Sequence, residues 1–111
     1  MRRSQIRWGL GFFLPLLTPM LAVAQQAQRA VLDKYCVTCH SEKARTGGLS
    51  LQNLDLANVP QSAETWEKVI RKLRVGAMPP QGMPRPDKSA VDGLTSFLEG
   101  ALDRAYAGTG P

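Results

Sequence analysis

The sequence, 111 residues long, is poor in the residue types that mark several common protein classes. Two cysteines are too few for a disulfide-dense scaffold, which needs several bridges. Neither a G-x-x-x-x-G-K nor a G-x-G-x-x-G motif occurs, so nucleotide binding has no support. No internal repeat is present, which excludes a solenoid. A chain this short, with 43% hydrophobic residues, has room for one small globular domain.

The first 24 residues have the pattern of an export signal. Three arginines near the start precede an uncharged, largely apolar stretch, which ends at Ala22-Val23-Ala24, the small-x-small form of a cleavage site. We therefore predict a signal peptide over residues 1–24, a periplasmic mature chain and no membrane span after cleavage. The alternative is an uncleaved membrane anchor, which Pro15 and Pro19 disfavour because proline removes a helical hydrogen bond in lipid.

The excess of positive charge belongs in large part to this segment. Without residues 1–24, the number of Lys and Arg falls from 14 to 11 while nine acidic residues remain, which leaves a net charge of +2. A charge of this size does not predict a nucleic-acid partner, because such binding depends on clustered cations. Export also places both cysteines outside the reducing cytosol.

Two helices with strong sequence signals are predicted in the second half of the chain. One begins after Ser62, an expected N-cap, and has an apolar stripe with helical spacing. The stripe consists of Trp66, Val69, Ile70 and Leu73. The other begins after Asp87, also an expected cap, and its apolar face extends to Ala105. Between them, residues 76–86 hold four of the eight prolines and are predicted to form a stiff loop.

An earlier helix, rich in Ala and Gln, is predicted over residues 25–40. Residues 41–61 are expected to be mostly irregular, and their leucines form either a short extended stretch or plugs for a core. These elements define an all-α domain over residues 25–106, with a disordered tail over residues 107–111. A domain this small usually needs a disulfide, a metal or a cofactor to stabilise it.

The chemistry of the chain is concentrated in Cys36-Val37-Thr38-Cys39-His40. C-x-x-C-H is the attachment signature of c-type haem. At the end of a helix, positions i, i+3 and i+4 share a face, so two thiols can reach the vinyl groups while the imidazole reaches the iron. The motif uses both cysteines and the one histidine of the chain. We therefore predict a covalent haem c, with its iron, held by Cys36, Cys39 and His40.

Two other interpretations of the cysteine pair are less well supported. A redox-active disulfide is possible, since C-x-x-C spacing lowers a thiol pKa, but it is expected next to a βαβ unit and no strand pattern builds one. A structural zinc site needs four ligands, usually as two spaced pairs, and a second pair is missing from the sequence.

The second axial ligand of the iron must come from another part of the chain. No second histidine exists, and the two methionines after the signal, Met78 and Met83, both lie in the proline-rich loop. A methionine opposite the histidine raises the reduction potential, as in electron-transfer cytochromes. We favour Met78, because Pro79 and Pro80 restrict the loop beside it and reduce the entropy lost on ordering. If both methionines only pack, the haem is five-coordinate and open to small ligands.

Several segments together closely resemble the planctomycete-type cytochrome c domain. They are Asp33–Glu42, Gly47-Gly48-Leu49-Ser50-Leu51, parts of 66–74, and Met78-Pro79-Pro80. The resemblance implies a small cytochrome-c-like fold of about three helices around a covalently attached haem, with His40 and Met78 as the metal ligands. It also implies fusion to, or association with, a larger exported protein, because relatives usually continue into further domains. The sequence differs from common small cytochromes in lacking a proline shortly after the haem histidine.

The function predicted is that of a periplasmic monohaem c-type electron carrier or electron-transfer domain, with redox proteins as donor and acceptor and no catalysis. One alternative is an open-site haem enzyme, peroxidase-like, or a gas sensor, for which Gln81 and Arg85 are the nearby polar groups. Another is an electron-transfer module of a larger exported enzyme. A basic stripe in the second helix is either a docking site for an acidic partner or a solvated face. It consists of Lys68, Arg71, Lys72 and Arg74.

Overall fold

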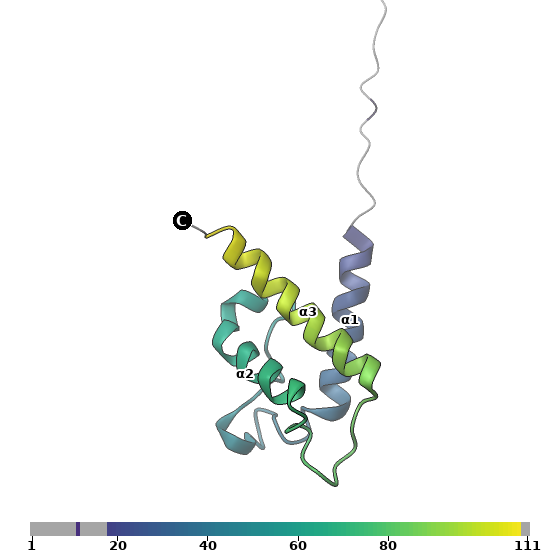
Figure 1. Ribbon diagram of the computed structural model, residues 1–111, viewed down its shortest axis with the longest axis vertical. Coiled ribbons are helices and arrows are strands. Elements are labelled where there is room, and N and C mark those ends of the chain that lie inside the picture. Colours follow the sequence, from purple (N-terminus) through teal and green to yellow (C-terminus); the bar gives the residue numbers. More distant parts are fainter. Residues whose placement is uncertain (1–10, 12–17, 110–111) are drawn as a thin grey trace, which may run out of the picture.

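The computed structural model describes residue 11 and residues 18–109, which form three α-helices and two short 3₁₀ turns (Figure 1). In chain order the elements are α1 (Thr18–Tyr35), η1 (Thr46–Gly48), η2 (Val59–Ser62), α2 (Ala63–Arg74) and α3 (Lys88–Ala107). No strand occurs in the described residues, and the predicted all-α class is confirmed. Residues 1–10 and 12–17 of the predicted signal peptide and residues 110–111 of the predicted tail lie outside the described residues.

Helix α1 has different bounds from the helix predicted over residues 25–40. It begins at Thr18 and ends at Tyr35, so the C-x-x-C-H motif follows the helix and is not part of it. The helical prediction for the motif was wrong, because the β-branched Val37 and Thr38 are weaker helix formers than the preceding Ala- and Gln-rich residues. The predicted cleavage point after Ala24 lies within α1. Among the described residues, no helix combines the length and the apolarity needed to cross a membrane.

Helix α2 buries the stripe predicted for it. All four stripe residues are buried, and Trp66 is fully enclosed. The prediction that the Ser62 side chain caps this helix was wrong, because no hydrogen bond from that side chain is made to the helix start. The 3₁₀ turn η2 leads directly into α2, and the Ala63 amide donates to the Pro60 carbonyl. A preceding backbone turn thus takes part of the capping role.

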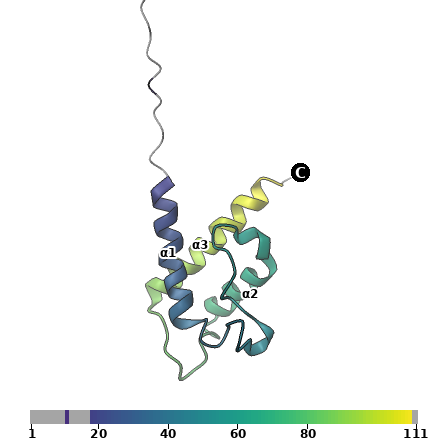
Figure 2. The same cartoon turned by 180° about the vertical axis from the view of Figure 1, so that it is seen from behind.

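Helix α3 crosses both other helices and is the element on which they meet (Figures 1 and 2). The core around it draws on helices and loops alike. Its members are Leu32 of α1, Leu51, Leu56 and Val59 of the connecting segment, the four stripe residues of α2, and Leu94, Leu98 and Leu102 of α3. Of the two roles left open for the leucines of residues 41–61, Leu51 and Leu56 therefore act as plugs for the core.

The N-terminus of α3 is capped as predicted. The Asp87 carboxylate accepts hydrogen bonds from the Ala90 amide at 2.8 Å and from the Ser89 hydroxyl at 2.9 Å. These two bonds, the amide first, hold the pKa of the Asp87 carboxyl below its ordinary value of 3.8. A carboxyl whose pKa is lower in the folded chain stabilises the fold once it is ionised.

This cap predicts a pH-dependent loss of stability. We expect Asp87→Ala to unfold at a lower temperature than the wild type at pH 7, because the ionised cap is lost. The difference between the two proteins should shrink as the pH falls from 3.8 through the lowered pKa, because the wild-type carboxyl then becomes protonated as well. Thermal unfolding followed by circular dichroism over this pH range measures the effect. Asp103→Ala, which removes an exposed carboxylate from the same helix, should unfold at nearly the wild-type temperature. A difference between Asp87→Ala and the wild type that is equal at every pH would contradict the role of the ionised Asp87 cap.

Candidate functional site

The C-x-x-C-H motif forms a turn that continues directly from α1. The Cys36 amide donates to the Leu32 carbonyl at 2.9 Å, which ties the start of the motif to the last turn of the helix. The His40 amide donates to the Cys36 carbonyl, also at 2.9 Å, and the Cys39 amide to the same oxygen at 3.3 Å. The bond between residues four apart is of the α-helical kind. The motif therefore brings Cys36, Cys39 and His40 together in one turn although the helix itself has ended.

The loop after the motif folds back onto it through the backbone. The Thr46 amide donates to the Cys39 carbonyl at 3.0 Å, and the Leu51 amide donates to the His40 carbonyl at 2.8 Å. The reversal uses left-handed backbone at Gly47 (φ 66°) and Gly48 (φ 76°), a region that favours glycine. The two glycines of the G-G-L-S-L segment thus allow Leu51 to return to His40.

One ring nitrogen of the His40 imidazole is turned into the protein. Nδ1 is buried and has no hydrogen-bond partner among the described residues, which leaves Nε2 as the nitrogen available to an iron. The residue as a whole is half-buried. An iron ligand needs its coordinating nitrogen free of the protein, so the donor set of the motif fits a haem with Nε2 as the ligating atom.

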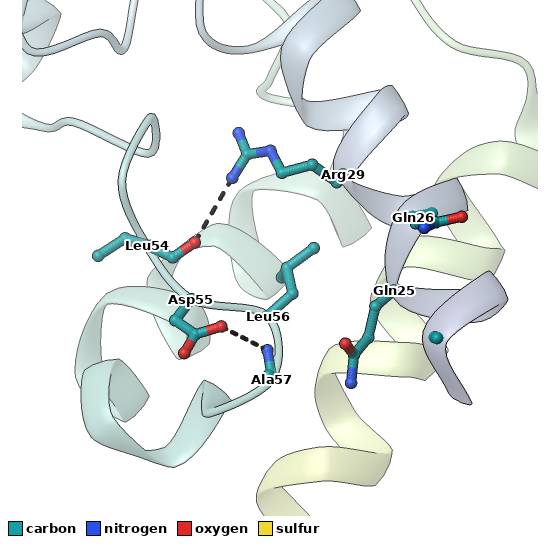
Figure 3. Close-up of a pocket in the computed structure, with 8 residues that line it drawn as sticks. Gln25, Gln26, Arg29, Leu54, Asp55, Leu56 and Ala57 are labelled. Carbon is teal, nitrogen blue, oxygen red and sulfur yellow. Dashed lines mark hydrogen bonds between the residues drawn. The ribbon is translucent and has the colours of Figure 1, made fainter. Parts of the chain in front are cut away.

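Arg29 of α1 supports this region and was missed by the sequence reasoning. Its guanidinium donates to the Leu54 carbonyl at 3.5 Å (Figure 3). It also donates to the Leu51 carbonyl at 3.2 Å, and its Nε donates to Asp33 at 2.8 Å. The i, i+4 spacing of Arg29 and Asp33 is a signal that the sequence contains, but backbone acceptors 22 and 25 residues away leave no pattern in it. Arg29 borders an open hollow of about 290 Å³ between α1 and residues 54–57.

The two thiols of the motif are free in the structure and half-buried. Burial raises the pKa of the Cys36 thiol, and the positive charge of Arg29 opposes that rise in part. Among the described residues, no three His, Cys, Asp or Glu side chains converge as a group that could hold a metal ion. Cys36, Cys39 and His40 thus share a turn without forming a chelate with one another.

Met78 lies in the loop between α2 and α3, and its side chain is half-buried. Met83, the other methionine of this loop, is 45% exposed. The loop is attached to the end of α2, since the amides of Ala77 and Met78 point to the Lys72 carbonyl at 3.0 and 3.4 Å. In both views this loop and the segment after α1 lie at the same end of the molecule, away from the start of α1 (Figures 1 and 2).

The remaining polar candidates are engaged in other interactions or are exposed. Arg85 donates to the carbonyls of Gly76 and Pro79, and Gln81 is exposed. Within the basic stripe, Lys68 pairs with an acid of its own helix, and Arg74 makes a two-pronged ion pair with Glu99 of α3. Arg71 and Lys72 are exposed, so half of the stripe is neutralised by ion pairs and half faces solvent.

Comparison with known proteins places this site in a family context. A family model described as Planctomycete cytochrome C matches residues 36–82. The match begins at the first cysteine of the motif and includes both 3₁₀ turns, all of α2 and Met78. No curated protein and no solved structure matches the chain.

The contacts of Arg29 predict a loss of stability on its replacement. We expect Arg29→Gln to lower the free energy of unfolding by about 1–3 kcal/mol, because partly buried carbonyls of Leu51 and Leu54 lose a charged donor. Arg71→Gln, at an exposed position of α2, should stay within about 0.5 kcal/mol of the wild type. Urea-induced unfolding measures both changes. Equal stability of the two variants would show that the Arg29 contacts contribute nothing specific.

Proposed function

Since residues 36–82 of this chain form a planctomycete-type cytochrome c domain, we propose that the protein transfers single electrons in the periplasm through one covalently attached haem c. The cytochrome c family itself indicates a haem-based role in electron transfer. The observation that carries the proposal is the C-x-x-C-H turn within the matched residues, together with a half-buried histidine whose Nδ1 is buried without a hydrogen-bond partner among the described residues. The predicted signal peptide supports the location, because haem c is attached after export.

Four residues of the chain would hold the group. Cys36 and Cys39 bind as thioethers, His40 binds the iron through Nε2, and Met78 binds it through its thioether sulfur. When bound, the haem iron supplies a one-electron couple between the ferric and ferrous states. The hydrogen bond from the Leu51 amide to the His40 carbonyl restrains the histidine, and the attachment of Ala77 to the end of α2 restrains the methionine. If His40 and Met78 stay bound to the iron in both the ferric and the ferrous state, the structural change on electron transfer is small.

The carrier function is favoured over an open-site haem enzyme or a gas sensor. Such a site needs polar groups on the free side of the iron, and Arg85 is one of two candidates for that role. Arg85 is bonded to loop carbonyls at 2.9 and 2.5 Å instead. A half-buried Met78 in the same loop supplies a soft ligand for the iron.

The proposed partners are a redox protein as donor and another as acceptor, with a larger exported protein, fused or associated, as the setting in which the domain works. Arg71 and Lys72 are exposed cations on α2. They would favour an acidic partner surface and accelerate the encounter through long-range attraction.

Covalent attachment gives a direct test of the proposal. We expect the chain, expressed in a host with a cytochrome-maturation system, to gain the mass of one haem and to keep its colour after acid-acetone extraction, because two thioether bonds hold the group. Replacing both Cys36 and Cys39 with alanine should abolish the mass gain. A haem that is extracted from the wild-type protein, or a colourless product, would refute the proposal.

The axial ligand is tested by two matched methionine variants. We expect Met78→Ala to lose the long-wavelength absorption band of the ferric Met–iron bond and to bind carbon monoxide rapidly when reduced, because the sixth position is opened. Met83→Ala should keep the band, since Met83 is the more exposed of the two methionines. Near-infrared magnetic circular dichroism of the ferric protein reports the ligand pair. If only Met83→Ala removes the band, Met83 is the ligand.

A further inference from the structure

We infer that Arg85 is a positioning residue for the Met78 thioether, an inference that rests on the proposed function. One nitrogen of the guanidinium, Nη2, donates to the Gly76 carbonyl at 2.9 Å and to the Pro79 carbonyl at 2.5 Å. These carbonyls belong to the residue two before Met78 and to the residue directly after it. A single side chain therefore closes the four-residue span in which Met78 lies.

The span needs such a donor because of its proline residues. Pro79 and Pro80 have no backbone N–H, so the chain after Met78 cannot fix itself by donating hydrogen bonds for two residues. On the other side of Met78, the amides of Ala77 and Met78 already point to the Lys72 carbonyl. The next backbone donor beyond the prolines that makes a turn bond is Met83, whose amide bonds to the Pro80 carbonyl at 3.1 Å. Arg85 thus supplies the Pro79 carbonyl with a donor that the local backbone lacks.

The charge of Arg85 strengthens this restraint. A hydrogen bond from a guanidinium to a carbonyl is stronger than one between neutral groups, and the planar guanidinium holds the two N–H bonds of Nη2 in fixed directions, unlike the rotating ammonium of lysine. Pro79 is buried and Met78 is half-buried, whereas Arg85 is exposed. The charged group therefore acts from the solvent side on a loop in which Met78 is half-buried.

Preorganisation of this loop has a consequence for ligand exchange. A loop that is ordered before it binds the iron gives up less entropy on binding, so the methionine competes better with an added ligand. Without Arg85, the Met78 ligand should be displaced more easily. The reporter of this effect is the affinity of the ferric protein for imidazole, which competes with the thioether for the sixth position.

The experiment uses the haem-loaded full chain, with Arg85→Ala compared against the wild type. We expect imidazole affinity to rise about tenfold, the factor that loss of a charge-assisted hydrogen bond corresponds to, and the Met–iron band to weaken. Arg85→Lys keeps the charge but not the planar group, so its imidazole affinity should lie between those of the wild type and Arg85→Ala. Arg104→Ala, which removes an exposed arginine of α3, is the matched control and should behave as the wild type.

A double variant separates positioning from any direct effect of Arg85 on the haem. In the Met78→Ala background, Arg85→Ala should leave imidazole affinity unchanged, because the group through which it acts is gone. An equal rise in both backgrounds would overturn the inference, as would wild-type affinity in Arg85→Ala. If Arg85→Ala does not fold, as judged by circular dichroism, the same comparison is made with Arg85→Lys.

The results that would refute the role of Arg85 can be distinguished from those that would refute the proposed function. A wild-type protein without covalent haem overturns both. A Met–iron band that survives Met78→Ala overturns the inference about Arg85 and the Met78 assignment, but leaves haem-based electron transfer standing. A wild-type protein with covalent haem and a band that depends on Met78, together with an Arg85→Ala variant that binds imidazole as the wild type does, overturns only the role of Arg85.

Discussion

The hydrogen bond from the Leu51 amide to the His40 carbonyl is the interaction on which the candidate site depends. Leu51 is 2% exposed, so its side chain is part of the core while its backbone reaches the motif. Its carbonyl accepts a hydrogen bond from Arg29 of α1. One residue therefore joins the core, the histidine and the first helix. Because the motif lies beyond the end of α1, this hydrogen bond restrains His40 in place of a continuing helix.

The core of the domain is built so that the site lies at its edge. Helices α2 and α3 bury regular apolar faces, whereas the segment between α1 and α2 contributes Leu51, Leu56 and Val59 without being helical for most of its length. Cys36 packs against this core, and the half-buried His40 has its Nδ1 inside the protein. Such an arrangement suits a large apolar cofactor that covers a core which is small by itself.

The parts of the fold that were predicted correctly have local causes. The stripe from Trp66 to Leu73 has the period of a helix, and Asp87 caps α3 by contacting a residue three positions away. The cap predicted at Ser62 failed because η2 leads into α2 and takes over part of its role. The helix predicted through the motif failed because Val37 and Thr38 are weak helix formers. The C-x-x-C-H motif can be recognised in the sequence because Cys36, Cys39 and His40 lie within five consecutive residues. The contacts of Arg29 and Arg85 are to backbone carbonyls, which every residue has, so sequence patterns cannot point to them.

Both sides of the candidate site are secured in the same physical way. The segment that contains His40 and the loop that contains Met78 both make backbone turn bonds, and in each an arginine side chain adds bonds to carbonyls in or next to that segment. Arg29 acts on the histidine side through Leu51, and Arg85 acts on the methionine side through Gly76 and Pro79. An electron carrier needs ligands that do not move when the charge of the iron changes. His40 and Met78 both lie outside the three helices, so their restraint comes from turn bonds of the backbone together with side chains that reach across to backbone carbonyls.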